Sequence, residues 1–269
     1  MDELLKIIDQ VIDCPTINGD VEFKPVIKKV AICIPLKGHT PPKAYNDRML
    51  MAFQLGQTEM EQRLKNEPIQ YIFYWFFAGE LFVPYARENL ANMALKYECD
   101  YLFSIDDDML APPDLFYRLV KHDVDIVAAL AFTRNPPYNP VICTSFNGFD
   151  PVTKQNFYTH STVKNYPRNT LVECDSVGFG AVLIKTAVFR GIPEPRFMSS
   201  NPSGEDVLFC TKAKEKGFRV FMDTSIKLGH LGDSVVITEG YADEFNKMDE
   251  AEREKLMGKY SYPSLEKAR

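Results

Sequence analysis

The sequence has no apolar stretch long enough to cross a membrane. Its longest unbroken apolar run, Tyr71 to Ala78, has eight residues, whereas a transmembrane helix needs about 20. The first residues carry acids where a secretory signal carries positive charge, and no small-residue cleavage site follows an apolar stretch. We therefore expect no transmembrane segment and a cytoplasmic location, with peripheral attachment to a membrane left open.

The sequence also lacks an excess of basic residues and closely spaced pairs of cysteines. The 31 Lys and Arg residues against 37 Asp and Glu residues give a net charge of −6, so the broad positive field of a dedicated nucleic-acid binder is lacking. The six cysteines include no C-x-x-C pair, which fits neither a disulfide framework nor a thiolate zinc site. We interpret them as reduced thiols in the core.

What the chain does have is an ordinary globular composition, 45% hydrophobic and 25% charged, which excludes disorder. Its 269 residues suit one large α/β domain or two small ones. We predict an N-terminal helix and linker over 1–28, a main domain over 29–232 and a C-terminal helical extension over 233–269. The N-terminal helix is expected to pack outside the main domain, because its apolar residues recur at helical spacing: Leu4, Leu5, Ile7, Ile8, Val11 and Ile12.

From Lys29 onward, short apolar runs alternate with helical stretches. The pattern predicts strands over 30–34, 70–77, 101–105 and 125–131, and helices over 44–65, 85–97 and from 112. Such alternation implies parallel pairing, and ligands of parallel sheets bind beyond the carboxyl ends of the strands. The loops that follow Ile34, Phe77, Ile105 and Ala131 are therefore expected to carry the site.

The second half has a different pattern. Short strand candidates over 141–146, 155–160, 171–177 and 181–184 are separated by Pro, Asn and Gly, which predicts an antiparallel extension. A helix over 205–216, a strand over 218–222 and a polar helix over 243–256 follow. For the polar helix a solvated cover and an oligomer contact both stay open, so a homo-oligomer is not excluded.

Three carboxylates, Asp106, Asp107 and Asp108, come directly after the strand over 101–105. Period-two alternation sends Asp106 and Asp108 to one side. A hard cation such as Mg²⁺ or Mn²⁺ that holds a diphosphate would relieve their repulsion. The alternative is a solvated loop whose acids cap the next helix.

The run from Tyr97 to Pro113 resembles the D-x-D segment of GT-A-fold glycosyltransferases, the nucleotide-sugar enzymes typified by the large inverting family 2. Two further segments are similar to the same family in the same order, Val83 to Ala91 and Gly204 to Gly232. Three ordered motifs are more specific than one. The resemblance covers roughly residues 29–232. It implies an α/β GT-A fold, a Rossmann-like mixed sheet with a parallel nucleotide-binding half and an antiparallel acceptor-side extension.

The resemblance also implies site residues. In the family the first Asp of the motif contacts the ribose and the last binds the metal, and His230 resembles the final metal ligand. A lone His is more often structural, and that reading stays open beside the resemblance. The expected metal ligands are Asp106, Asp108 and His230. The expected donor-binding residues are Pro35 after the first strand, Arg87 and Asn89 at a helix start, Asp106, Asp107, and the strand-entry glycines Gly178 and Gly180.

Two of these features keep a second interpretation. Gly178 and Gly180 either let the backbone approach a ligand closely or mark a strand bulge. Arg134, which follows the strand over 125–131, either binds phosphate or is a surface cation in a proline-stiffened loop.

Glu205 and Asp206 begin a predicted helix, where the helix dipole favours ionised carboxylates. Adjacent side chains on a helix point about 100° apart, so only one of the two can face the donor. The resemblance favours Asp206 as the base for the acceptor hydroxyl and leaves Glu205 to bind the acceptor or nearby backbone. The alternative is an ordinary acidic first turn.

The expected function is a metal-dependent glycosyltransferase that moves a sugar from a UDP-sugar or GDP-sugar to an acceptor hydroxyl, with Mn²⁺ or Mg²⁺ and with inversion. A nucleotidyltransferase or hydrolase that uses the same acidic site is the alternative, although no phosphate loop of the G-x-x-x-x-G-K-[ST] type is present. A non-catalytic carbohydrate-binding protein is a third class, which the acids and His230 disfavour. The acceptor stays open among a glycan, a lipid carrier, a protein and a modified DNA base.

Overall fold

The structure is a computed structural model that describes residues 24–36, 40–79, 82–150, 155–199, 204–232 and 235–258. The predicted N-terminal helix from Leu4 to Ile12 therefore lies outside the described residues. Among the helices in the described ranges, none is long and apolar enough to span a bilayer.

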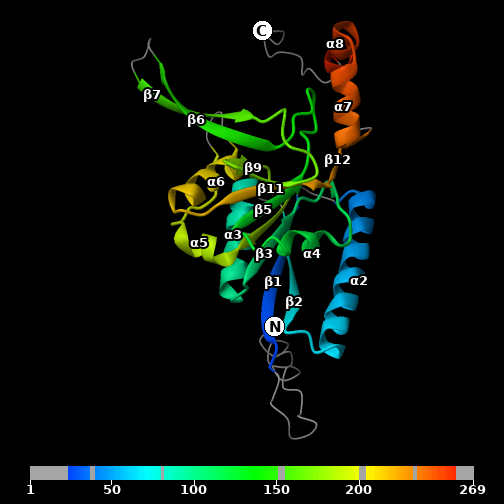
Figure 1. Ribbon diagram of the computed structural model, residues 1–269, viewed down its shortest axis with the longest axis vertical. Helices are drawn as coiled ribbons and strands as arrows, with labels where there is room; N and C mark the ends of the chain where they lie inside the picture. Colours follow the sequence, from blue (N-terminus) through cyan, green and yellow to red (C-terminus); the bar gives the residue numbers. More distant parts are fainter. Residues whose placement is uncertain are drawn as a thin grey trace, which may run out of the picture.

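The centre of the molecule is a seven-stranded mixed sheet (Figure 1). Three neighbouring strands at one edge run parallel, and the strands beyond them mix both directions. The strand order is β2 (Ile69–Ala78), β1 (Val26–Pro35), β3 (Tyr101–Ile105), β10 (Ala181–Lys185), β5 (Ile126–Leu130), β11 (Val220–Lys227) and β8 (Leu171–Cys174).

Helices cover both faces of this sheet. Alternate residues of each strand point to opposite faces, so each strand contributes side chains to both helix layers. In β1, Ala31 and Cys33 pack with the helices α3 (Val83–Lys96), α5 (Thr186–Gly191) and α6 (Glu205–Glu215). Their neighbours Val30 and Ile32 pack with α2 (Pro42–Leu64) and α4 (Leu115–Val120). Figure 1 shows α2 along the outside of the molecule, apart from α3, α5 and α6.

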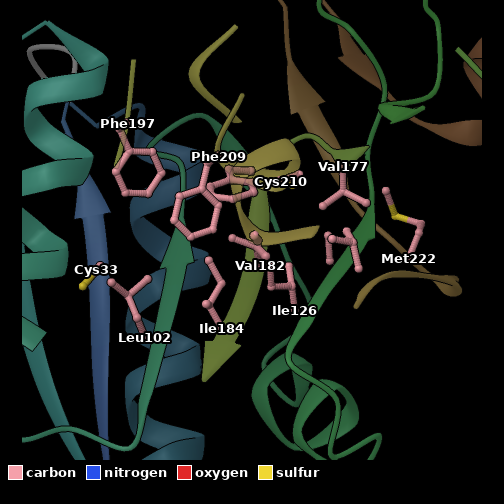
Figure 2. Packing of buried hydrophobic residues seen from close by; sticks show 14 of the residues in the cluster. Cys33, Leu102, Ile126, Val177, Val182, Ile184, Phe197, Phe209, Cys210 and Met222 are labelled. Carbon is pink, nitrogen blue, oxygen red and sulfur yellow. The ribbon is translucent and has the colours of Figure 1, made fainter. Parts of the chain in front are cut away.

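The core on the first face includes stacked aromatic rings. Figure 2 shows Phe197 beside Phe209 of α6, close to Val182 and Ile184 of β10. The Phe197 and Phe209 ring centroids are 4.6 Å apart and the planes differ by 8°. This packing holds α6, and with it the acids at its start, against the central strand β10.

Two small sheets and two helices complete the described fold. One sheet contains β13 (Val236–Ile237), β12 (Gly229–Leu231) and β4 (Met109–Leu110), and the other contains β7 (Gln155–Thr162), β6 (Ile142–Asp150) and β9 (Ser176–Val177). The helices α7 (Glu239–Lys247) and α8 (Glu250–Gly258) end the described chain.

The predicted fold class, an α/β mixed sheet with a parallel N-terminal half and antiparallel strands beyond it, is confirmed. One detail differs from the expected separate extension, because β10 pairs antiparallel with both β3 and β5 inside the main sheet. The single helix predicted over 243–256 is wrong. Met248 adopts an extended conformation and ends α7, and the Asp249 side chain accepts a hydrogen bond from the Glu252 N–H at the start of α8.

Candidate functional site

A cavity of about 400 Å³ lies beyond the carboxyl ends of β1, β3 and β5. Every predicted site residue but one lines it: Pro35, Arg87, Asp106, Asp107, Asp108, Gly178, Gly180, Glu205, Asp206 and His230. Asn89 is different, because it is exposed on α3 and is not among the lining residues. Parallel strands thus bring distant segments to one place, as expected for ligand sites in such sheets.

Arg87 is the buried cation of the cavity, with 6% of its side chain exposed. It lies in the first turns of α3, a helix that begins with proline at its first positions, where proline is well tolerated. Its Nη2 donates to Asp106 Oδ1 at 2.8 Å and to Oδ2 at 3.1 Å. Its Nε donates to Glu205 Oε1 at 3.1 Å. One guanidinium therefore ties together α3, the end of β3 and the start of α6.

The acids around Arg87 keep it charged. Burial works to lower the pKa of Arg87, but the carboxylates of Asp106, Glu205 and Asp206 outweigh it and leave the pKa raised. The Glu205 carboxylate is held by this ion pair. Its role is therefore to hold the Arg87 guanidinium in place.

Asp206 lies partly buried beside this cluster. Its Oδ1 accepts a hydrogen bond of 2.8 Å from the Val207 N–H. A Cβ atom at Gly204 would lie 2.8 Å from the same oxygen, so glycine leaves room for the carboxylate. Burial, and then the neighbouring Glu205, raises the pKa of Asp206. A carboxylate with a raised pKa is better suited to accept a proton at neutral pH.

Asp108 and His230 form the other charged part of the cavity. Residue 230 lies on β12, which pairs with β4 just after the acidic triplet. The His230 Nδ1 is 2.7 Å from the Phe132 carbonyl oxygen, which can only accept, so we assign the proton to Nδ1. Burial lowers the pKa of His230, which favours the neutral ring. Its bare Nε2 lies 3.4 Å from Asp108 Oδ2.

Two acceptors that face each other with no proton between them suit a cation. Asp108 and His230 therefore fit as two ligands of a divalent metal, and the oxygen and imidazole donors are of the right kind. The guanidinium of Arg134 pairs with Asp108 in the structure. Within the described ranges, no group of three or more His, Cys, Asp or Glu residues is placed to hold a metal. Asp106 instead pairs with Arg87.

The glycines at the entry to β10 form a wall of the cavity made of backbone. The Gly180 carbonyl accepts a hydrogen bond of 2.9 Å from the Asp106 N–H. A Cβ atom at Gly180 would lie 2.9 Å from Met109 Cε, and one at Gly178 would lie 2.7 Å from Val141 Cβ. Gly178 therefore needs to be glycine for close packing against the branched Val141, whereas a Cβ at Gly180 would displace the flexible end of Met109.

Two residues of α2 that were not predicted as site residues hold the acidic triplet and the segment directly after it. Arg48 is 6% exposed and its Nη2 donates to the carbonyl oxygens of Asp106, at 2.8 Å, and Met109, at 3.0 Å. Its neighbour Asp47 accepts a hydrogen bond of 3.2 Å from the Ala111 N–H. Burial lowers the pKa of Arg48 to about 10. The sequence feature that could have indicated a buried role for Arg48 is its helical spacing from the apolar residues Ala44, Met51 and Leu55.

The likeness of this chain to known proteins is one of structure. No protein-family model matches it, and no curated protein does. The crystal structure of A197 from STIV is similar at a TM-score of 0.51 and 19% identity, over 79% of this chain and 91% of that chain. GalNAc-T7 with UDP, GalNAc and Mn²⁺ has a TM-score of 0.46 and 10% identity, over 75% of this chain and 43% of its own. An apo UDP-glucose pyrophosphorylase has a TM-score of 0.45 and 10% identity, over 82% of this chain and 97% of its own. The chain therefore shares its α/β architecture with A197, and at this identity the likeness concerns the fold alone.

Proposed function

We propose that the protein transfers a sugar from a nucleoside-diphosphate sugar to an acceptor hydroxyl, with inversion and with Mn²⁺ or Mg²⁺. The observation that carries the proposal is the arrangement of acids in one cavity. Asp206 lies partly buried next to the Arg87 cluster, and Asp108 faces the bare Nε2 of His230. A proton acceptor and a cation site thus share one space, which sugar transfer to a hydroxyl requires.

The charge of the cavity supports a role for a divalent cation. Its lining includes five carboxylates (Asp106, Asp107, Asp108, Glu205 and Asp206) and two arginines (Arg87 and Arg134), while burial favours the neutral form of His230. A diphosphate would add further negative charge to this excess. Asp108 and His230 would hold the cation, and a cation bound there would neutralise charge on the departing diphosphate.

Asp206 is the proposed base, and Glu205 is the proposed positioning residue. The raised pKa of Asp206 suits it to receive the proton of the acceptor hydroxyl. Glu205 keeps Arg87 in place through its ion pair. Arg87 and the ends of β1 and β3 would in turn orient the nucleotide, which is proposed to be a UDP-sugar or a GDP-sugar.

The test is to incubate the protein with UDP-sugars and GDP-sugars, Mn²⁺ and a panel of hydroxyl acceptors, and to measure the products. Glycosyl transfer releases nucleoside diphosphate only together with glycosylated acceptor. Release of diphosphate and free sugar without an acceptor would indicate a hydrolase. Consumption of a nucleotide sugar only when inorganic pyrophosphate is added would indicate a nucleotidyltransferase. Failure to consume any sugar nucleotide would contradict the proposal.

Asp206→Asn tests the base. We expect transfer to fall by about 10²–10⁴, the usual contribution of a positioned base, while nucleotide affinity stays within about twofold. Glu205→Gln is the matched control, and it should weaken nucleotide binding more than it slows the chemical step, because it loosens Arg87. A single-turnover measurement separates binding from chemistry. Full activity in Asp206→Asn would assign the base elsewhere.

A further inference from the structure

One face of α2 is mostly apolar and exposed, with Asn46 and Arg63 at its two borders. We call it the α2 stripe and define it as Tyr45, Met49, Phe53, Met60 and Leu64. At 100° per residue these positions fall within an arc of about 100°. Phe53 is 66% exposed and Leu64 77%. The opposite side of the helix packs on the sheet through Met51 and Leu55. A contiguous exposed apolar surface of this kind marks an interaction site.

Gly56 lies in the middle of the α2 stripe. In helical projection it falls between Tyr45 and Met49, and a Cβ atom added there would meet nothing within 4 Å. Glycine weakens a helix interior relative to alanine, and no packing within the described chain requires it. A missing side chain on an apolar helix face lets a second helix approach closely.

We propose that the α2 stripe is the docking surface for residues 4–12 of this same chain. The sequence predicts a helix there with one apolar face, formed by Leu4, Leu5, Ile7, Ile8, Val11 and Ile12. Such a face cannot stay in water without cost. The inference does not depend on the proposed reaction.

The chain geometry allows this docking. The described chain begins at Lys24, and Val26 pairs with Ile69, five residues beyond the end of α2 at Leu64. Figure 1 shows the start of β1 and the carboxyl end of α2 at the same end of the molecule. Residues 13–23 can span about 36 Å when extended, and α2 is about 34 Å long. The segment can therefore reach the carboxyl half of the stripe, including Phe53, which lies about 17 Å along the helix from Leu64.

Two other occupants fit less well. A second copy of this chain on the stripe would leave the apolar face predicted for residues 4–12 without a partner. An anionic membrane would require a basic border. The helix α2 has three basic and three acidic residues, and residues 1–23 have one Lys and six acids.

The test uses the full chain and trypsin. Residues 1–23 contain one basic residue, Lys6, and Lys24 precedes a proline, so cleavage after Lys6 reports on this segment. Docking protects the bond, because a protease cleaves only the opened segment. The variants are Phe53→Ser on the stripe, Ile8→Ser on the segment, and both together. The matched controls are Tyr85→Ser, an equally exposed aromatic on α3, and Gln10→Ser on the polar face of the predicted helix.

We expect Phe53→Ser and Ile8→Ser each to raise the rate of cleavage after Lys6 about tenfold. The double variant should be cleaved no faster than either one, because the two changes remove the same contact. The controls should stay within about twofold. Far-ultraviolet circular dichroism checks that each variant is folded, which we expect because Phe53 is exposed.

Three results would overturn the proposal. The first is a wild-type chain that is cleaved after Lys6 as fast as the variants. The second is a dimer, detected by light scattering, that Phe53→Ser dissociates without changing the cleavage rate. The third is binding to anionic lipid vesicles that Phe53→Ser abolishes while cleavage after Lys6 is unaffected.

Discussion

The cavity contains two pairs of arginine and aspartate that differ in burial. The Arg87 side chain is 6% exposed and Asp106 is 26% exposed. The Arg134 side chain is 40% exposed, and its partner Asp108 is 18% exposed. Arg87 also bonds Glu205 and Ser104, and its guanidinium lies 5.4 Å from the Phe179 ring centre. For Arg134 the structure gives an ion pair with Asp108 at the open side of the cavity.

The difference separates a fixed part of the site from an exchangeable part. Breaking a buried ion pair is strongly destabilising, because the partner is left as an uncompensated buried charge. An exposed pair contributes about 0–1 kcal/mol and is readily exchanged. We therefore expect the Arg87 cluster to persist when ligands bind, and Asp108 to exchange Arg134 for another cation.

The largest effect should follow Arg87→Met. This change removes a buried guanidinium and leaves the partly buried carboxylates of Asp106 and Glu205 without their cation. We expect the free energy of unfolding to fall by about 3–5 kcal/mol, measured by urea denaturation at pH 7. A loss under about 1 kcal/mol would show that Arg87 is not an anchor, and the contrast between the two pairs would fail.

Asp108→Asn should affect binding more than folding. We expect the affinity for UDP or GDP in the presence of Mn²⁺, measured by calorimetry, to fall about 100-fold, or ~2.7 kcal/mol. The free energy of unfolding should change by less than about 1 kcal/mol, because the partner Arg134 is 40% exposed, unlike the buried Arg87 that pairs with Asp106. Asp106→Asn is the comparison variant, and it should lose more stability than Asp108→Asn. Equal stability losses in both would contradict the division into fixed and exchangeable parts.

Asp223 lies away from the cavity. The pH dependence of the free energy of unfolding tests whether this buried, hydrogen-bonded carboxylate stabilises the fold. Asp223 is buried, and burial alone would raise its pKa. Hydrogen bonds from Ser225 and His122 outweigh this and hold the pKa below its usual value. The folded protein therefore binds this proton less readily than the unfolded chain does. The stabilisation is present above the unfolded value, about 3.9, and is lost as the pH falls below it through the folded pKa.

Asp223→Asn should therefore lower the free energy of unfolding at pH 7 by about 1–2 kcal/mol. The difference from the wild type should disappear as the pH falls below about 4. Denaturation series between pH 7 and pH 3 provide the measurement. A difference that is the same at both ends of the series would exclude the charge of Asp223 as its cause.

The smallest effect should follow Arg134→Gln. Its exposed ion pair predicts a change in the free energy of unfolding of less than about 1 kcal/mol. Arg134→Gln should change Mn²⁺-dependent affinity for UDP or GDP by a few-fold at most, far less than Asp108→Asn, when both are titrated side by side. If Arg134→Gln destabilised the fold as much as Arg87→Met, burial would not be what distinguishes the two pairs.

Local patterns in the sequence predicted the strand β3, the acids after it and the acidic start of α6. These features depend on neighbours in the chain, such as the apolar run that ends at Ile105. The pairing of Arg87 with Glu205 joins residues 118 positions apart, which no local pattern encodes. The insertion of β10 between β3 and β5 is equally non-local. The role of Arg48 was missed because a charged residue on a buried helix face shows its partners only once the chain is folded.

The backbone wall at Gly178 and Gly180 has a consequence for the size of ligand that fits. Because neither glycine has a side chain, Val141 and Met109 take the space that their Cβ atoms would fill. Valine is branched at Cβ and therefore restricted in its rotamers, whereas methionine is unbranched, with three rotatable bonds, and fills irregular gaps. The cavity therefore has a rigid border near Val141 and an adjustable one near Met109. We therefore expect ligands that differ in bulk to be accommodated on the Met109 side of the cavity and not on the Val141 side.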